Sequence, residues 1–475
     1  MRKIPYGQIN FERIIKENYL YVDKTKYIEK LENLNETSLF YLRPGRFGKS
    51  LFTNMLDYYY AIDKTDKFDE LFNNLYIKDH PTVNKNNYYI LNFDFSGIDS
   101  NDNWDIDILM EAFNAKVIDG ITKFIERYNI KFNIDKTQTP STLIGSLITH
   151  FEGLKLENKI YIIIDEYDNY TNGILKGNAE KFLTMLTGEG FIKGFYAKIK
   201  EAIKAGVVER FFATGIAPMT LDSMTTGFNI ATDLTRKPKF VSMIGLTKQE
   251  VKNVIKEVLP QKRETEQEEI YKEMEQYYDG YRFSEVNEET TFNTTLVMYY
   301  LKEYVESGKR PLEMLDMNVS ANFEKLENLI TLKNNEYSKE VLESLIQNKD
   351  ITEKIVNKFN LKMDITRDVV LSMLFYFGYS TIKENDVTFK IPNYVMSGIY
   401  NDYFIQLLKR EGTPIDVSKI KEAIRELAYE GKIDKLCYQV EEYLSYLGNI
   451  TWQKYDEKYV KGYHKKTWRN LLWFM

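Results

Sequence analysis

Residues 38–50 read SLFYLRPGRFGKS, an apolar run that leads directly into a short loop. The run Ser38–Pro44 predicts a buried strand, and the residues after the loop, LFTNMLDYYY, predict a helix. The loop keeps the Gly48–Ser50 end of the phosphate-loop (Walker A) pattern G-x-x-x-x-G-K-S/T, but Arg43 stands at its first glycine position. A strand, a loop of this kind and a helix in this order predict an α/β fold with a phosphate site.

The chemistry of such a loop depends mainly on its backbone amides, which curl around phosphate oxygens at the positive end of the following helix. Lys49 would neutralise the β- and γ-phosphates, and the hydroxyl of Ser50 would coordinate Mg²⁺. Arg46 would either contact phosphate or shield the loop by pairing with a carboxylate. Taken alone, GKS leaves open a turn and helix start that bind no ligand. The expected nucleotide-binding residues of the loop are Arg43, Pro44, Gly45, Arg46, Phe47, Gly48, Lys49, Ser50 and Leu51.

A second motif, IYIIIDEYD at Ile160–Asp168, has the form of a Walker B strand. Asp165 at the end of the strand would hold Mg²⁺, and Glu166 would orient and polarise the attacking water as the catalytic base. A surface acidic turn is the alternative for this segment alone, but two motifs in the expected order at strand ends argue against it. The stretch between Lys49 and Asp165 is long enough for another strand and its helices.

The rest of the first half alternates apolar runs with longer amphipathic stretches. Continuous apolar runs are typical of strands buried on both faces of a parallel sheet, and alternation with helices indicates a layered α/β domain. The further strands are expected at Tyr88–Phe95, Arg210–Ile216 and Phe240–Gly245, and the helices at Ile106–Tyr128 and Phe191–Ala205.

Two weaker candidates lie near the ends of the later strands. Thr214 stands where a sensor of the γ-phosphate or of the catalytic water would sit, or it simply ends its strand. Arg236 precedes the last expected strand, where it would serve as a finger for a neighbouring nucleotide or lie on the surface as an ordinary arginine.

Composition narrows the class of protein. The chain has 475 residues with 43% hydrophobic and 28% charged residues, which is typical of globular domains, and a net charge of −6 gives no general attraction for nucleic acid. The single cysteine, Cys437, excludes an internal disulfide framework and is expected to fill a core position. The longest apolar run, Val369–Tyr379, is too short to span a bilayer, and no leader is evident, so we expect a cytoplasmic protein with no membrane partner.

Several segments together resemble a known family. The start YGQINFERIIKENYLYVDKTKYIEKL, the loop RPGRFGKS, IIIDEYDN, FATGIAP, GLTKQEV, YYDGYRF, LSMLFYFGYSTIK and IPNY are similar to the AAA-ATPase-like family of bacteria and anaerobic fungi, in collinear order over roughly residues 1–400. Members typically have arginines at the positions of Arg43 and Arg46, so the missing first glycine is ordinary for the family. This chain departs at Gly45, where many members have another arginine.

The resemblance implies a P-loop core at residues 1–246, a mostly parallel layered sheet, followed by α-rich parts. A helical lid would occupy residues 247–310, where Thr247–Glu250 has the form of a capping box, and a winged-helix-like segment residues 311–400. Residues 401–475 would form a helical tail, for which a remnant of a nuclease-like domain is one interpretation.

The motif YYDGYRF opens the expected lid. Arg282 is a candidate for reaching back to a bound nucleotide. The simpler interpretation gives Tyr278, Tyr281 and Phe283 a packing role and Gly280 a turn.

Many family members continue into a PD-(D/E)xK nuclease-like domain. No apolar strand carrying D…E-x-K follows residue 400, so nuclease activity is not expected from this chain. The tail at residues 459–475 reads unlike the family's continuation, which is consistent with a truncation, a frameshift, a wrong gene model or a natural short form.

The functional expectation is Mg²⁺-dependent binding and hydrolysis of ATP, with ATP drawing the lid onto the core as a conformational switch. The alternatives are an ATP-binding regulatory scaffold without turnover and the ATPase front end of a truncated nuclease-linked defence or mobile-element protein. Adenine specificity and contact with nucleic acid are implications of the resemblance alone. The protein client, the oligomeric state and the presence of an arginine finger are left open.

Overall fold

The structure, a computed structural model, describes residues 2–98, 106–169, 191–218, 231–316, 336–347, 350–357, 359, 366–384, 387–410, 416–439 and 441–442. The chain divides into two compact units. The larger unit consists of residues 1–341 and 350–395, and the smaller one of residues 342–349 and 396–475.

The centre of the larger unit is a five-stranded sheet with the order β2-β3-β4-β1-β5, in which all neighbours are parallel. The first four predicted strands are confirmed, and β4 lies between the strands that carry the two motifs, β1 and β3. This is the parallel α/β fold of P-loop proteins. The strands are β1 (Ser38–Leu42), β2 (Tyr88–Asp94), β3 (Lys159–Asp165), β4 (Val208–Gly215) and β5 (Thr232–Asp233).

The prediction of a fifth strand at Phe240–Gly245 is wrong. The edge strand is instead the short β5, which pairs with Leu39 and Phe40 of β1. The apolar run begins in the 3-10 helix η4 (Pro238–Phe240) and continues as turns, with the backbone N–H of Met243 donating to the carbonyl of Phe240 at 3.0 Å. Its side chains are nevertheless buried. A continuous apolar run predicts burial, but it does not predict that the segment pairs with a neighbouring strand.

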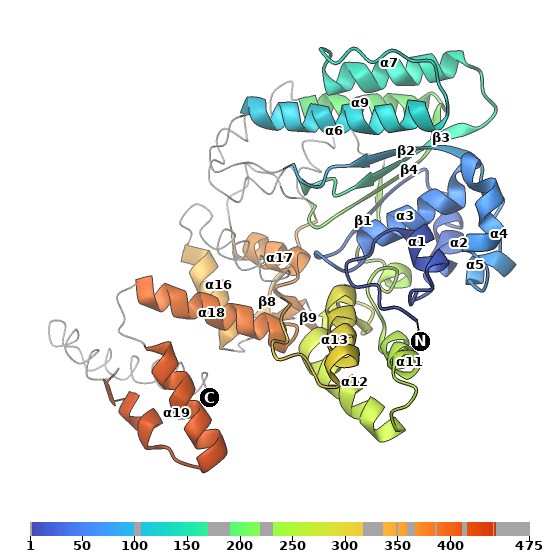
Figure 1. Cartoon of the computed structure of the whole chain (residues 1–475). Helices are drawn as coiled ribbons and strands as arrows, with labels where there is room; N and C mark the ends of the chain where they lie inside the picture. The colour runs from blue at the N-terminus through green and yellow to red at the C-terminus, as the bar shows by residue number, and fades with distance from the viewer. Residues whose placement is uncertain are drawn as a thin grey trace. The chain divides into compact units, whose positions relative to one another are not determined.

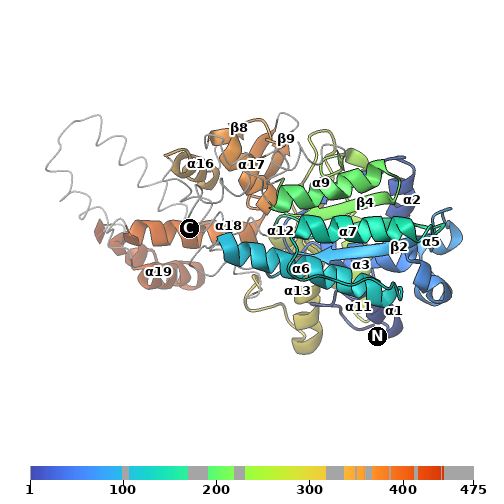
Figure 2. The same ribbon diagram turned by 90° about the horizontal axis from the view of Figure 1, so that it is seen from above.

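Helices cover both faces of the sheet (Figures 1 and 2). Seen from above, three long helices run side by side over one face, and α6 approaches β2 so closely that a Cβ at Gly120 would lie 2.6 Å from the ring of Phe93. The covering helices are α6 (Ile106–Arg127), α7 (Pro140–Gly153) and α9 (Phe191–Lys204) on that face. The opposite side carries α3 (Lys49–Tyr60) with α1 (Phe11–Lys16), α2 (Lys26–Glu32), η1 (Ile62–Lys67), α4 (Phe68–Leu71) and α5 (Tyr76–Asp79).

A helical part follows the sheet in the same unit. The helix α11 (Lys248–Val258) begins with the predicted capping box, in which Thr247 accepts a hydrogen bond from the N–H of Glu250 and the Glu250 carboxylate accepts one from the N–H of Thr247. The remaining elements are α12 (Glu264–Tyr278), the antiparallel pair β6 (Tyr281–Arg282) and β7 (Thr290–Thr291), and α13 (Thr294–Ser307).

The segment LSMLFYFGYSTIK forms most of a helix and the first strand of a hairpin. The hairpin strands are part of a three-stranded antiparallel sheet with the order β8-β10-β9. The aromatic residues of YYDGYRF (Tyr278, Tyr281 and Phe283) are buried, as the packing interpretation expected. The elements are α17 (Arg367–Phe377), β8 (Ile351–Thr352), β9 (Thr381–Glu384) and β10 (Thr388–Lys390).

The smaller unit is helical where it is described. The helix α19 (Val417–Glu430) starts at the capping side chain of Asp416 and ends at Gly431, whose φ is +70°. The prediction that Cys437 fills a core position is wrong, because its side chain is exposed while its neighbour Leu436 is buried. The remaining helices are α16 (Glu336–Ile346) and α18 (Tyr394–Arg410), which pass from the larger unit into the smaller one; residues 443–475 lie outside the described residues.

Among the residues that the structure describes, no helix combines the length and the apolar character needed to cross a membrane.

Candidate active site

The loop that joins β1 to α3 is shaped by two residues with left-handed backbone conformations. Arg46 has a φ of +67° and Gly48 a φ of +108°, and Gly48 is the residue from which α3 begins. Lys49 and Ser50 are therefore the first two residues of the helix, where backbone N–H groups lack partners within the helix. This end of α3 is an electropositive cradle for an anion.

The side chain of Lys49 turns back over its own loop. Its Nζ donates to the carbonyl of Arg43 at 3.1 Å and to that of Pro44 at 3.2 Å, and the side chain is buried. These are neutral acceptors, so an anionic phosphate oxygen that entered the loop would be a stronger partner for the ammonium.

The tip of β3 lies against this loop. The helix α3 packs against β3, so its first turn lies near the Walker B strand end. Burial raises the pKa of Asp165 to about 6, and the charges of Glu166 and Asp94 act in the same direction, while the nearby Ser50 hydroxyl and the charge of Lys49 oppose the rise. The partly buried carboxylate of Asp165 and the hydroxyl of Ser50 are the hard oxygen ligands that Mg²⁺ prefers.

Glu166 occupies a strained turn immediately after β3. Its φ is +50°, a region that a glutamate rarely adopts, and its N–H donates to Oδ1 of Asp165 at 3.0 Å. Its side chain is only partly buried. Strained non-glycine residues concentrate at functional sites, because only the surrounding structure holds them in place.

Asp94 is a functional candidate that the sequence analysis missed. It ends β2 and is the register partner of Asp165, so two carboxylates lie side by side at the same edge of the sheet. Asp94 is exposed, and its Oδ1 accepts a hydrogen bond from the N–H of Ser96 at 2.8 Å. An acidic residue at the carboxyl end of a predicted parallel strand was the available signal.

Asp168 is a second residue that was missed. Its buried carboxylate accepts hydrogen bonds from the N–H groups of Ile216 at 3.1 Å and Ala217 at 2.8 Å, just past the end of β4. A Cβ at Gly215 would lie 2.2 Å from its Oδ1, so this approach requires glycine. Burial raises the pKa of Asp168 to about 6. Only tertiary structure could reveal this link between the ends of β3 and β4.

Comparison with protein families finds a match over the part of the chain that contains both motifs. Residues 5–225 match the AAA-ATPase-like family model, described as Predicted AAA-ATPase. This similarity indicates nucleotide binding.

Two solved structures are similar to the chain at low identity. A Walker-type ATPase of Pyrococcus abyssi shares 14% identity at a TM-score of 0.40, with 84% of this chain and 98% of that chain covered. The ORC2 protein of Aeropyrum pernix, in ADPNP–ADP complexes, shares 13% identity at a TM-score of 0.36, with the same coverage of 84% and 98%. Both TM-scores are low, and the fold is established by the strand order of this chain. No curated protein matches the chain.

Arg43, expected among the nucleotide-binding residues, has its side chain inside the AAA-ATPase-like domain. The guanidinium is 1% exposed and donates to the carbonyls of Leu42, Thr235 and Val241 at 2.8–2.9 Å. It also lies over the rings of Tyr41 and Phe283 at 4.3 and 4.0 Å. Arg43 thus ties the start of the loop to the core. Its backbone is engaged as well, because its N–H donates to the carbonyl of Gly215 at 3.0 Å and its carbonyl accepts from Lys49.

The other loop residues contribute in a similar way. Phe47 is buried against the aromatic rings of Tyr281 and Phe283, and Pro44 packs where a Cβ at Gly378 would lie 2.9 Å away. The backbone N–H groups of Gly45, Phe47, Gly48 and Leu51 are left to meet a phosphate, whereas Pro44 has no N–H and its carbonyl accepts from Nζ of Lys49.

Thr214 and Arg282 are engaged elsewhere in the structure. The hydroxyl of Thr214 donates to the carbonyl of Tyr41 at 2.6 Å, between β4 and β1. The buried guanidinium of Arg282 donates to four carbonyls, so the geometry gives it a structural role in place of the expected contact with nucleotide. These carbonyls belong to Ser284, Glu285, Asn287 and Lys383.

Arg236 pairs within its own chain. It contacts the carboxylate of Glu285 and donates to Oδ1 of Asn357 at 2.6 Å. The side chain of Arg236 is partly buried by these contacts, and its role as a finger for a neighbouring nucleotide stays a prediction.

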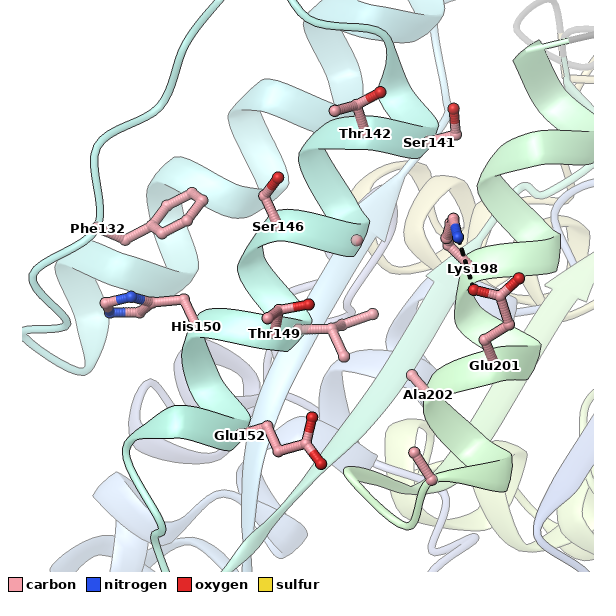
Figure 3. A pocket seen from close by; sticks show the side chains of 13 residues that line it. Phe132, Ser141, Thr142, Ser146, Thr149, His150, Glu152, Lys198, Glu201 and Ala202 are labelled. Carbon is pink, nitrogen blue, oxygen red and sulfur yellow. Dashed lines mark hydrogen bonds and ion pairs between the residues drawn. The ribbon is translucent and has the colours of Figure 1, made fainter.

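A separate pocket of about 770 Å³ lies between α7 and α9 (Figure 3). Thr142, Ser146 and Thr149 line it from α7, and Lys198, which is paired with Glu201 at 2.6 Å, lines it from α9. Neither helix carries a residue of the two motifs, so this pocket is not part of the candidate active site.

Proposed function

We propose that the AAA-ATPase-like domain binds Mg²⁺-ATP at the loop between β1 and α3 and hydrolyses it. The observation that supports this most directly is the packing of α3 against β3, which brings the helix start with Lys49 and Ser50 near the carboxylate of Asp165 at the end of the strand. Glu166 follows Asp165 directly, so a phosphate held by the loop would face a carboxylate.

Each residue then has a distinct task. The loop amides and Lys49 would hold the β- and γ-phosphates of ATP. Ser50 and Asp165 would hold Mg²⁺, directly or through its waters, and the ion would neutralise charge on the phosphate oxygens. Glu166 would orient a water toward the γ-phosphorus and accept its proton as the new P–O bond forms and ADP leaves.

We further propose that ATP binding and hydrolysis shift the helical lid relative to the core. A partly buried ion pair supports a mechanical link between them. Nζ of Lys24, from the N-terminal segment, lies 2.7 Å from Oε2 of Glu250 in the capping box of α11 and donates to the carbonyl of Ser242 at 3.0 Å. The start of α11 is therefore anchored to the core and available as a pivot.

A second candidate is an ATP-binding scaffold that does not turn ATP over. The contacts of Arg236 and Arg282 favour it, because both guanidiniums are engaged by protein groups, and a scaffold needs no arginine to stabilise charge in a transition state.

Single-turnover hydrolysis of labelled ATP, with protein in excess and Mg²⁺ present, tests these two functions. The comparison is between wild type, Glu166→Gln and the control Glu157→Gln. Glu157 is exposed and precedes the first residue of β3, whereas Glu166 follows the last one. We expect cleavage by wild type and Glu157→Gln, and a rate about 10²–10⁴-fold lower for Glu166→Gln with ATP still bound. Bound ATP that none of the three proteins cleaves would favour the scaffold, and an unaltered rate for Glu166→Gln would remove its assignment as base.

A further inference from the structure

The outer side of the phosphate loop is held by the start of α13, about 250 residues away in the chain. The hydroxyl of Thr294 donates to the carbonyl of Phe47 at 2.8 Å. Thr295 donates to the carbonyl of Arg46 twice, from its hydroxyl at 2.8 Å and from its backbone N–H at 3.2 Å. Two consecutive loop carbonyls therefore have partners on one helix.

The cap of the same helix completes the contact. Asn293 accepts a hydrogen bond from the N–H of Leu296 at 3.2 Å, which caps α13, while its amide nitrogen lies 3.5 Å from the carbonyl of Gly45. The side chain of Thr294 also comes within 4.0 Å of where a Cβ at Gly48 would lie. One helix start thus follows the loop along its outer edge.

Peptide geometry makes these contacts relevant to ligand binding. In a trans peptide the carbonyl and the N–H of the next residue point in opposite directions. Holding the carbonyls of Arg46 and Phe47 toward α13 therefore aims the N–H groups of Phe47 and Gly48 away from α13, into the curve of the loop. Those are amides of the kind that a phosphate loop uses.

The backbone of the loop needs such support. Arg46 sits at a φ of +67°, which costs free energy for a residue with a side chain, and its carbonyl is the one that Thr295 binds twice. The side chain of Phe47 is held as well, since Tyr281 lies edge-on to it with the ring centroids 5.0 Å apart.

We propose that Thr294 and Thr295 are positioning residues for the phosphate site and that α13 senses its occupancy through them. Phosphate binding would fix the amides from inside the loop, while the two threonines fix the carbonyls from outside. Phosphate binding and the threonine hydrogen bonds would therefore stabilise each other. The inference rests on the proposed nucleotide site and adds the route by which that site is coupled to the lid.

The test is binding of Mg²⁺-ATP to the full chain by isothermal titration calorimetry, for wild type, Thr294→Val/Thr295→Val and the matched control Thr294→Ser/Thr295→Ser. Valine keeps the shape of threonine and removes the hydroxyl, while serine keeps the hydroxyl. We expect the valine variant to raise Kd by about 5–100-fold and the serine variant to stay within about threefold of wild type. The single variant Thr295→Val, at the more exposed of the two hydrogen bonds, covers the case in which the double variant does not fold.

Hydrogen exchange of residues 294–307 supplies a readout that mere packing would not change. We expect ATP to slow exchange in wild type and in the serine variant, and to have little effect in the valine variant. A folded valine variant that binds ATP with the wild-type Kd would overturn the positioning role alone. A wild type that binds no ATP would overturn the proposed function and this inference with it.

Discussion

Oδ2 of Asp168 accepts a hydrogen bond from the backbone N–H of Ala217 at 2.8 Å. The residue is buried, with only 5% of its surface exposed. The same turn is fastened a second time, because the hydroxyl of Tyr167 donates to the carbonyl of Ala217 at 2.7 Å. The Walker B turn and the end of β4 are therefore one rigid piece beside the phosphate loop. A buried carboxylate in this position makes the stability of the site depend on pH.

The first prediction concerns that dependence. Burial raises the pKa of Asp168 from an ordinary 3.8 to about 6, so the folded protein binds this proton at a higher pH than the unfolded chain does. Its contribution to the free energy of unfolding is therefore greatest below about pH 4 and falls by about 2–3 kcal/mol as the pH rises through about 6. Asp168→Asn should remove this part of the slope.

Urea unfolding without nucleotide between pH 4.5 and 7.5 measures the effect. Asp165, whose pKa is also raised to about 6, is present in both proteins, so its contribution cancels in the difference. Parallel pH profiles for wild type and Asp168→Asn would contradict the prediction.

The second prediction concerns Lys49. Lys49→Ala removes the ammonium that would bind the β- and γ-phosphates and should raise the Kd for Mg²⁺-ATP by about 10–100-fold, the effect of losing charge-assisted hydrogen bonds. The control is Lys26→Ala, at an exposed lysine that begins α2. Calorimetric titration decides the matter, and unchanged binding by a folded Lys49→Ala would argue against a nucleotide in this loop.

The third prediction separates two arginines of the loop. Arg43→Met leaves three buried carbonyls without their donor and should lower the free energy of unfolding by about 3 kcal/mol or more. Arg46→Ala changes an exposed side chain and should alter stability by less than about 1 kcal/mol. Chemical denaturation without nucleotide compares them. Equal stability of the two variants would show that Arg43 is not the structural residue described here.

The fourth prediction concerns the turn of YYDGYRF. Gly280 has a φ of +94°, and a Cβ there would lie 2.2 Å from the carbonyl oxygen of Pro392, so Gly280→Ala is both strained and obstructed. We expect Gly280→Ala to lower the free energy of unfolding by about 3 kcal/mol or more, and Gly308→Ala to lower it by about 1 kcal/mol. Gly308 has a φ of +73° and no atom within 4 Å of its Cβ position. Gly308→Ala therefore measures the cost of the backbone conformation without a steric clash. Thermal melts of the two variants should differ clearly, and similar melting would refute the close approach.

Interactions between residues close in sequence could be predicted from the sequence alone. The apolar runs of β1 to β4, the loop before α3 and the capping box at Thr247 each consist of contiguous residues whose pattern determines their local structure. The parallel sheet and the position of the two motifs at strand ends followed from these patterns, because buried runs separated by helices have few other arrangements.

Interactions across long sequence separations were decided only by the tertiary structure. The donors on Arg43, Arg282 and Thr294 could satisfy a nucleotide or a protein carbonyl equally well in chemical terms, and the sequence does not say which acceptor is nearby. In the folded protein these donors bind carbonyls. Arg43 donates to the carbonyl of Val241, and Thr294 donates to that of Phe47. The apolar run at Phe240 was buried without a strand partner for the same reason. A residue's own chemistry determines what it can bind, whereas the fold determines what lies within reach of it.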